Sequence, residues 1–374
     1  MIFAADEYER RYGRIRAEMA ARGLDALIVT RGENIFYGSG YKAEHFASWL
    51  CELHALLVPS KGDPRIMTRS LEREAAKIQF TPSPILYADH ESPYGYVVEV
   101  FGQSGDTAGT IGIEERFLKL SQFNKLKAAL PDARFVDTTG MIEAIAATPS
   151  PAESACLRRA AHITKIGLET GLRGARAGVY PYEVLGRIHD AMYAAGQSDF
   201  DMSLVAIWSG PKGGLMHDTS TTEKIKNGDI VTVEIMGVDN HYRAGAQACV
   251  YVGDGPPPRN VVNAHKLVVE MHKGAKNAVR AGMTAGDVFQ AASAVYRAAT
   301  GADYYRRCGG SLGLTIFTLD LVKGRKEVLR PGVALLIQTL VDDPVLLTCA
   351  STVMVTETGF EELTHPVLEL KPRL

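Results

Sequence analysis

Hydrophobic and polar residues follow two periods along the first 145 residues of the chain, one typical of helices and one typical of buried strands. A helix is predicted over residues 6–22, where four apolar side chains fall on one face: Tyr8, Tyr12, Ile15 and Met19. The other elements predicted from apolar runs and amphipathic stretches are strands at 24–29, 54–58 and 110–113 and helices at 71–78 and 120–129. Because strands alternate with helices, we expect an open, mainly parallel α/β sheet in this half.

A domain boundary is predicted at two closely spaced prolines, Pro149 and Pro151, because proline interrupts regular structure. The boundary divides the chain into an N-terminal domain of residues 1–148 and a C-terminal domain of residues 149–374. A long helical pattern begins directly after Pro151.

The C-terminal half contains an internal repeat with an offset of 104 residues. Arg176-Ala177-Gly178 and Arg280-Ala281-Gly282 each precede an amphipathic stretch. The same offset separates the turn and strand at 225–234 from the turn and strand at 329–338. These matches predict a duplicated α/β unit with a pseudo-twofold axis.

Two polar residues, Glu234 and Gln338, occupy equivalent positions in this repeat, each at the end of an apolar strand. A polar side chain that enters a core is costly unless it finds a partner. The pseudo-twofold axis would bring the two side chains close to each other, and pockets commonly form at such interfaces. We therefore predict a site there.

Composition narrows the range of partners. The 41 basic and 43 acidic residues give a net charge of -2 and form no long block, so we expect neither a nucleic acid nor a membrane surface as a partner. The sequence has no run of 18 apolar residues, and Asp6 and Glu7 argue against a secretory signal. Five scattered cysteines without a CxxC pair are typical of reduced thiols, so a cytoplasmic location is predicted.

Several short motifs follow the order and spacing of a known superfamily: Gly228-Asp229-Ile230-Val231, Val252-Gly253, Pro331-Gly332 and the ending from Val355 to Thr364. On these motifs the chain resembles creatinase, prolidase, aminopeptidase P and methionine aminopeptidase. The resemblance implies a pita-bread α/β domain with a curved antiparallel sheet and a pseudo-twofold repeat. It also implies a preceding α/β domain that takes part in dimerisation, so a homodimer is expected.

The peptidases of this superfamily bind two divalent metals through two aspartates, a histidine and two glutamates. The resemblance carries these five positions onto Glu234, Gly245, Gly310, Gln338 and Ala350. Glycine and alanine supply no side-chain ligand, and a neutral glutamine binds a hard cation poorly. The resemblance therefore favours the metal-free branch, similar to creatinase and ectoine hydrolase, and we expect neither a metal nor another cofactor.

One polar group of the superfamily is kept, because His217 stands where creatinase has its acid–base histidine. We predict His217 as the acid–base group and Glu234 as the carboxylate that orients it. Gln247 and Gln338 replace the two glutamates that hold the creatine guanidinium, so a neutral amide or a carboxylate is the expected ligand. Arg243 would bind such a carboxylate.

Further substrate contacts are expected from Gly310 and from the segment 41–52, whose aromatic residues Phe46 and Trp49 are typical of an interface or a pocket cover. The leading functional prediction is a metal-independent hydrolase of a C–N bond in a small carboxylate-bearing amide, amidine or lactam. Two alternatives stay open: a catalytically inactive domain that binds a ligand or a protein, and a metal-free lyase or isomerase with His217 as its base.

Overall fold

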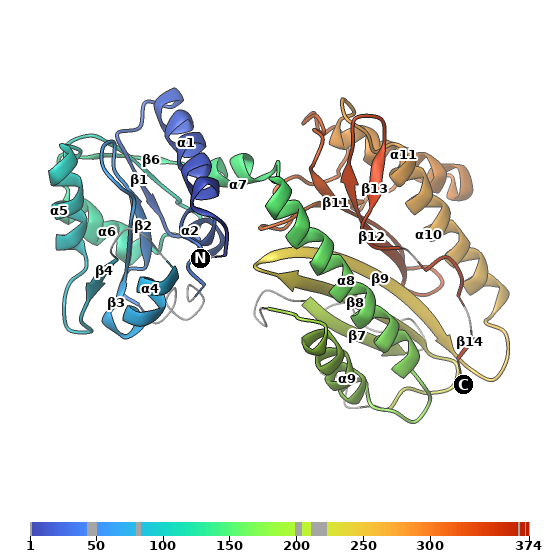
Figure 1. The fold of residues 1–374 in the computed structure, drawn as a ribbon. Coiled ribbons are helices and arrows are strands. Elements are labelled where there is room, and N and C mark those ends of the chain that lie inside the picture. The colour runs from blue at the N-terminus through green and yellow to red at the C-terminus, as the bar shows by residue number, and fades with distance from the viewer. Residues whose placement is uncertain are drawn as a thin grey trace. The chain divides into compact units, whose positions relative to one another are not determined.

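The part of the chain that the computed structural model describes comprises residues 2–42, 51–79, 84–198, 204–210, 223–365, 367–370 and 372–373. The chain forms two compact units, Met1–Ala146 and Ala147–Leu374. Each unit has its own sheet (Figure 1). Each also has its own hydrophobic core.

The N-terminal unit contains a six-stranded sheet with the strand order β4-β3-β2-β1-β5-β6. Its described elements are α1 (Ala5–Ala21), β1 (Ala26–Val29), α2 (Gly32–Ser39), β2 (Ala55–Val58), β3 (Arg65–Arg69), η1 (Ser70–Glu72), α4 (Arg73–Gln79), β4 (Ile85–Tyr87), α5 (Tyr94–Ser104), β5 (Thr110–Ile113), α6 (Leu120–Ala129), β6 (Arg134–Asp137) and α7 (Met141–Ala146). The predicted alternation of strands and helices is confirmed.

One strand of this sheet, β2, departs from the parallel arrangement that was predicted for most of the sheet. β1 pairs with β5, β5 with β6 and β3 with β4 in parallel, but β2 is antiparallel to both β1 and β3. The connection from β2 to β3 runs only from Pro59 to Pro64, which is too short for the crossover that a parallel pair requires. The sheet is therefore mixed.

The C-terminal unit repeats one arrangement of two helices followed by three strands. Its first copy is α8 (Pro151–Gly174), α9 (Pro181–Ala194), β7 (Leu204–Gly210), β8 (Ile230–Asp239) and β9 (Tyr242–Val252). Its second copy is α10 (Arg259–Asn277), α11 (Ala285–Thr300), β10 (Gly309–Leu312), β11 (Ala334–Val341) and β12 (Leu347–Val355), followed by β13 (Phe360–Glu362) and β14 (Pro372–Arg373). None of the described helices of the chain is both long and apolar enough to cross a membrane.

The strand order of this second sheet is symmetric about its centre. The strands lie in the order β10-β11-β12-β9-β8-β7, and each neighbouring pair along this path is antiparallel. The equivalent strands β8 and β11 begin at residues 230 and 334, which reproduces the predicted offset. The predicted pseudo-twofold repeat is therefore confirmed, and its axis passes between β9 and β12.

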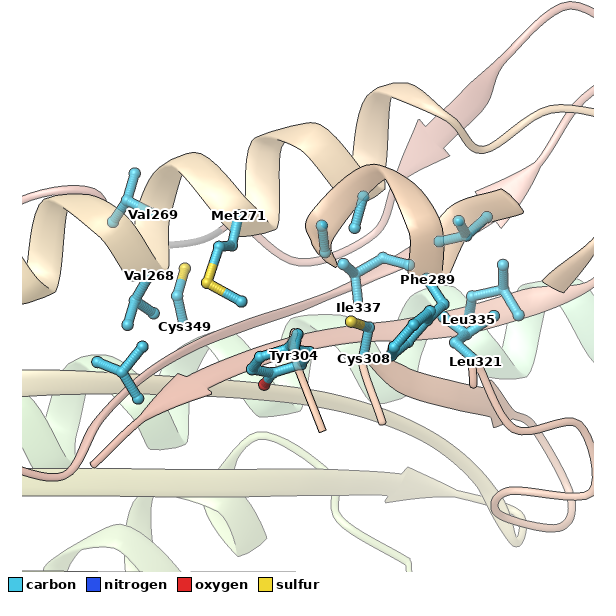
Figure 2. Packing of buried hydrophobic residues seen from close by; sticks show 14 of the residues in the cluster. Val268, Val269, Met271, Phe289, Tyr304, Cys308, Leu321, Leu335, Ile337 and Cys349 are labelled. Atoms are coloured by element: carbon cyan, nitrogen blue, oxygen red, sulfur yellow. The ribbon is translucent and has the colours of Figure 1, made fainter. Parts of the chain in front are cut away.

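Both helix pairs cover the same face of this sheet. Ile235, Ala246, Ser351 and Ile337 are direct neighbours across β8, β9, β12 and β11, so their side chains point to one face. Ile235 belongs to the core formed with α8 and α9, and Ile337 belongs to the core formed with α10 and α11. Figure 2 shows side chains of the second core, which come from α10 and α11, from β11 and β12, and from the segments on either side of β10. The next residue along each strand therefore points to the opposite face.

Gly309 at the start of β10 cannot be replaced unless β11 moves. Its φ is 108°, and a Cβ at this position would lie 1.9 Å from the carbonyl oxygen of Leu336. Because a backbone atom must shift, Gly309→Ala is expected to lower the free energy of unfolding by about 2–3 kcal/mol. Urea unfolding followed by circular dichroism measures this loss. The matched control is Gly186→Ala, at an exposed position inside α9, which should be neutral or stabilising. Equal stabilities of the two variants would refute the expectation.

Candidate functional site

A row of side chains crosses four strands on the face opposite the helices. Glu234 of β8 lies directly beside Gln247 of β9, Gln247 lies beside Ala350 of β12, and Ala350 lies beside Gln338 of β11. Glu234 and Gln338 are equivalent residues of the two repeats, so the pseudo-twofold axis brings both onto one row. We call Glu234, Gln247 and Gln338 the polar row.

Gln247 connects the two ends of the polar row. Its amide nitrogen donates to Glu234 Oε2 at 3.3 Å, and its amide oxygen accepts hydrogen bonds from Gln338 Nε2 at 2.8 Å and Thr348 Oγ1 at 2.6 Å. The small side chain of Ala350 leaves room for the bond between the two glutamines. Gln247 is buried, whereas Glu234 and Gln338 are half-buried. The row is therefore fixed at its centre, while both ends keep some contact with solvent.

The environment of Glu234 favours its protonated form. Burial raises the pKa of this carboxyl group to about 7, because its charged form loses water. Within the described ranges, the carboxylate receives one hydrogen bond, from the neutral amide of Gln247. Near neutral pH the group is then present in both protonation states, which is the property required of a general acid or base.

Two other predicted substrate contacts, Arg243 and Gly310, belong to β9 and β10 and are not members of the polar row. Arg243 is buried in β9, and its guanidinium donates to the carbonyl oxygen of Leu314 at 2.5 Å. Gly310 belongs to β10, where it pairs with Leu336 of β11. The Arg243 guanidinium is therefore bound by the protein's own backbone. The roles of Arg243 and Gly310 toward a substrate stay predictions.

Three predicted site residues, His217, Phe46 and Trp49, lie outside the described residues. Their roles as an acid–base group and as substrate contacts therefore stay predictions. Glu234 is the titratable member of the polar row.

The five positions at which the resemblance implies metal ligands do not form a ligand set. Glu234 carries the one charged side chain among them, and the Gln338 amide already donates within the polar row. Gly245, Gly310 and Ala350 have no side-chain ligand to offer. Across the described parts of the chain, no group of three or more His, Cys, Asp and Glu side chains is arranged to hold a metal ion. These residues do not fit a pair of divalent metals.

Sequence reasoning missed Thr348, the residue that anchors Gln247 from the neighbouring strand. Its buried hydroxyl donates to the Gln247 amide oxygen. A signal was present in the sequence, because Thr348, Ala350 and Thr352 alternate along β12. This alternation places small and polar residues on the face of the polar row.

Two family profiles match the chain, and together they extend over both structural units. The profile described as the Creatinase/Prolidase N-terminal domain matches residues 11–145. The profile described as Metallopeptidase family M24 matches residues 155–357.

Individual relatives match over nearly their full length. The uncharacterized hydrolase/peptidase y4tL of Sinorhizobium fredii is 25% identical over 388 residues, which cover 99% of this chain and 97% of that protein. The probable dipeptidase PepE of Mycobacterium tuberculosis is 28% identical over 351 residues, which cover 90% of this chain and 88% of that protein. The Xaa-Pro dipeptidase of Bacillus anthracis shares the fold, with a TM-score of 0.85 at 22% identity over 98% of this chain and 100% of that chain.

These comparisons support the prediction of a hydrolase and contradict the predicted substrate class. The relatives are named as hydrolases, peptidases and dipeptidases, so the chain is a hydrolase. The predicted cleavage of a non-peptide C–N bond in a small amide, amidine or lactam is wrong, because the relatives are named for action on peptides. The predicted metal independence gains no support from these comparisons, because the matching family is described as a metallopeptidase family. The same names give no support to an inactive binding domain, a lyase or an isomerase. Gln247 and Gln338 suit a small neutral ligand, but their amides pair with a peptide unit equally well.

Proposed function

Because the chain belongs to metallopeptidase family M24, we propose that it is a hydrolase of short peptides that acts at the polar row. The observation that carries this proposal is the hydrogen-bonded chain from Glu234 through Gln247 to Gln338, with both ends half-buried on the face opposite the helices. A dipeptide is the favoured substrate size, because relatives that match over most of their length are named dipeptidases.

The polar row offers the contacts that a peptide unit needs. A peptide unit presents one N–H donor and one carbonyl acceptor. Gln338 has an amide oxygen and a second amide N–H beyond the bond that it donates to Gln247. Glu234 has a second carboxyl oxygen beyond the one that accepts from Gln247. A peptide carbonyl bound between these ends would accept a hydrogen bond from Gln338 and turn its carbon toward Glu234.

Glu234 would act first as a base and then as an acid. Its carboxylate takes a proton from water, and the water oxygen adds to the carbonyl carbon. The proton then passes to the leaving amine nitrogen as the C–N bond breaks. A pKa of about 7 suits both transfers near neutral pH. The Gln338 amide would stabilise the negative charge that develops on the carbonyl oxygen.

Hydrolysis of a dipeptide panel tests the proposed function. The full-length protein is incubated with dipeptides of varied side chains, Xaa-Pro included, with and without added Mn²⁺. Free amino acids are quantified by mass spectrometry. We expect release from at least one dipeptide, and the proposed function is wrong if no dipeptide is cleaved under either condition.

Replacement of Gln247 by Met is expected to move the acidic limb of the pH–rate profile to higher pH. Gln247 donates to the Glu234 carboxylate, so its removal destabilises the ionised form and raises the pKa of Glu234 further. An upward shift of about 0.5–1 pH unit is expected in kcat/KM for a cleaved dipeptide. The control Thr348→Val removes a different hydrogen bond to Gln247 and should leave the limb in place. A limb that does not move in Gln247→Met would contradict the expectation.

A homodimer and a cytoplasmic location also stay proposals. The N-terminal unit matches the Creatinase/Prolidase N-terminal domain, and the resemblance associates that domain with dimerisation. Cys51, Cys156, Cys249, Cys308 and Cys349 are all free and buried, which supports a reducing compartment.

A further inference from the structure

An apolar cluster lies beside the polar row on the same sheet. Met236, Leu312, Leu336 and Ala350 are each at most 5% exposed and pack together, and Phe317 packs against them. We call these five residues the apolar plug. They come from β8, β10, β11, β12 and the segment that follows β10.

The plug fills the space beside Gly245. This glycine pairs with Met236 across β8 and β9, two residues from Gln247 and on the same face. A Cβ at Gly245 would lie 3.2 Å from Leu336 Cδ1 and 3.6 Å from Leu312 Cδ1. The aspartate that the resemblance implies at this position would therefore direct its carboxylate among leucine side chains.

The plug residue Phe317 also leaves no room for a side chain at Gly310. A Cβ at this residue would lie 2.5 Å from Phe317 Cδ1 and 2.7 Å from the carbonyl oxygen of Leu319. The guanidinium of Arg307 covers the Phe317 ring at 4.2 Å from its centroid. A histidine at Gly310 would therefore collide with the ring and with the backbone.

We infer that the apolar plug replaces the divalent-metal pair that the family name implies, so that this face of the sheet binds no Mn²⁺, Co²⁺ or Zn²⁺. These cations need several oxygen, nitrogen or thiolate ligands. The plug presents methyl, thioether and ring groups, among which an ion would lose its water without replacement. Glu234, the one charged side chain among the five positions at which the resemblance implies ligands, is insufficient to hold an ion. The inference concerns cation binding and does not rest on the proposed function.

Metal analysis of the full-length protein tests the inference. Wild type and Glu234→Gln are dialysed against excess Mn²⁺, Co²⁺ or Zn²⁺, freed of unbound metal by gel filtration, and analysed by inductively coupled plasma mass spectrometry. We expect fewer than about 0.1 ions per wild-type chain, or the same content in both proteins if an ion binds elsewhere. About one or two ions per wild-type chain that are lost in Glu234→Gln would overturn the inference.

A second readout is the melting temperature, which rises when a ligand binds the folded state alone. Wild type and Glu234→Gln should show the same response to each metal. A rise that only wild type shows would overturn the inference.

Neither readout involves catalysis, so the two proposals can fail separately. Dipeptide hydrolysis that requires added Mn²⁺ and is accompanied by metal loss in Glu234→Gln would overturn the plug but not the proposed function. A protein that binds no metal and cleaves no dipeptide would overturn the proposed function but not the inference about the plug.

Discussion

Leu336→Asp is expected to lower the free energy of unfolding of the C-terminal unit by more than about 4 kcal/mol. Leu336 is 3% exposed, and it packs with Met236 and Leu312 in the apolar plug. A carboxylate at this position would lose its water and gain no partner from these side chains. Protonation would relieve part of the cost, so the loss of stability should be smaller at acid pH.

Urea unfolding followed by circular dichroism measures the effect, and two variants make it specific. Leu336→Ala leaves a cavity without a charge and should cost about 2–5 kcal/mol. Leu368→Asp introduces the same charge in the same unit at a side chain that is 48% exposed, and it should change stability by less than about 0.5 kcal/mol. If Leu336→Asp were as stable as Leu368→Asp, or were stabilised by added Mn²⁺, the plug would not be the apolar core described above.

Glu234→Gln is expected to lower kcat/KM for dipeptide hydrolysis by about 10²–10⁴-fold. Glutamine keeps the size of the side chain and can still form a hydrogen bond with Gln247, but it cannot exchange a proton with water. The loss should therefore appear mainly in kcat, with a smaller change in KM. Steady-state kinetics of the purified variant measure both constants, and activity equal to that of wild type would exclude Glu234 as the base.

The same substitution also tests the electrostatics of the folded protein. Because burial raises the pKa of Glu234 from 4.5 to about 7, the stability linked to its protonated form is fully present below about pH 4.5 and is lost as pH rises through about 7. Glutamine cannot ionise, so Glu234→Gln should exceed wild type in stability at pH 8 by up to about 3 kcal/mol. Thermal unfolding at pH 5 and pH 8 measures the difference. A variant that is less stable than wild type at pH 8 would contradict the raised pKa.

The fold could be predicted in outline because periodicity and internal repeats are visible in the sequence itself. The helix predicted over residues 6–22 buries Tyr8 and Met19 on its predicted face. The repeat offset correctly identified Glu234 and Gln338 as equivalent strand positions. The direction of β2 was not evident, because a short buried strand has the same apolar composition whichever way it runs.

The site was less predictable because it depends on contacts between distant strands. The equivalence of Glu234 and Gln338 suggested that they approach each other. The bridge through Gln247 and its support by Thr348 require the register of β9 against β12, which no local motif specifies. At Gly245 the sequence indicated only the loss of a ligand. That leucine side chains fill the space follows from packing in three dimensions.

The pH dependence of kcat/KM for the dipeptide that is cleaved fastest tests most directly whether the Glu234 carboxyl group carries the proton transfer. The rate is predicted to rise with pH through an apparent pKa near 7 in wild type, and the residual rate of Glu234→Gln should lack this limb. A limb near the ordinary glutamate value of 4.5, or the same limb in wild type and Glu234→Gln, would contradict the proposed role of Glu234.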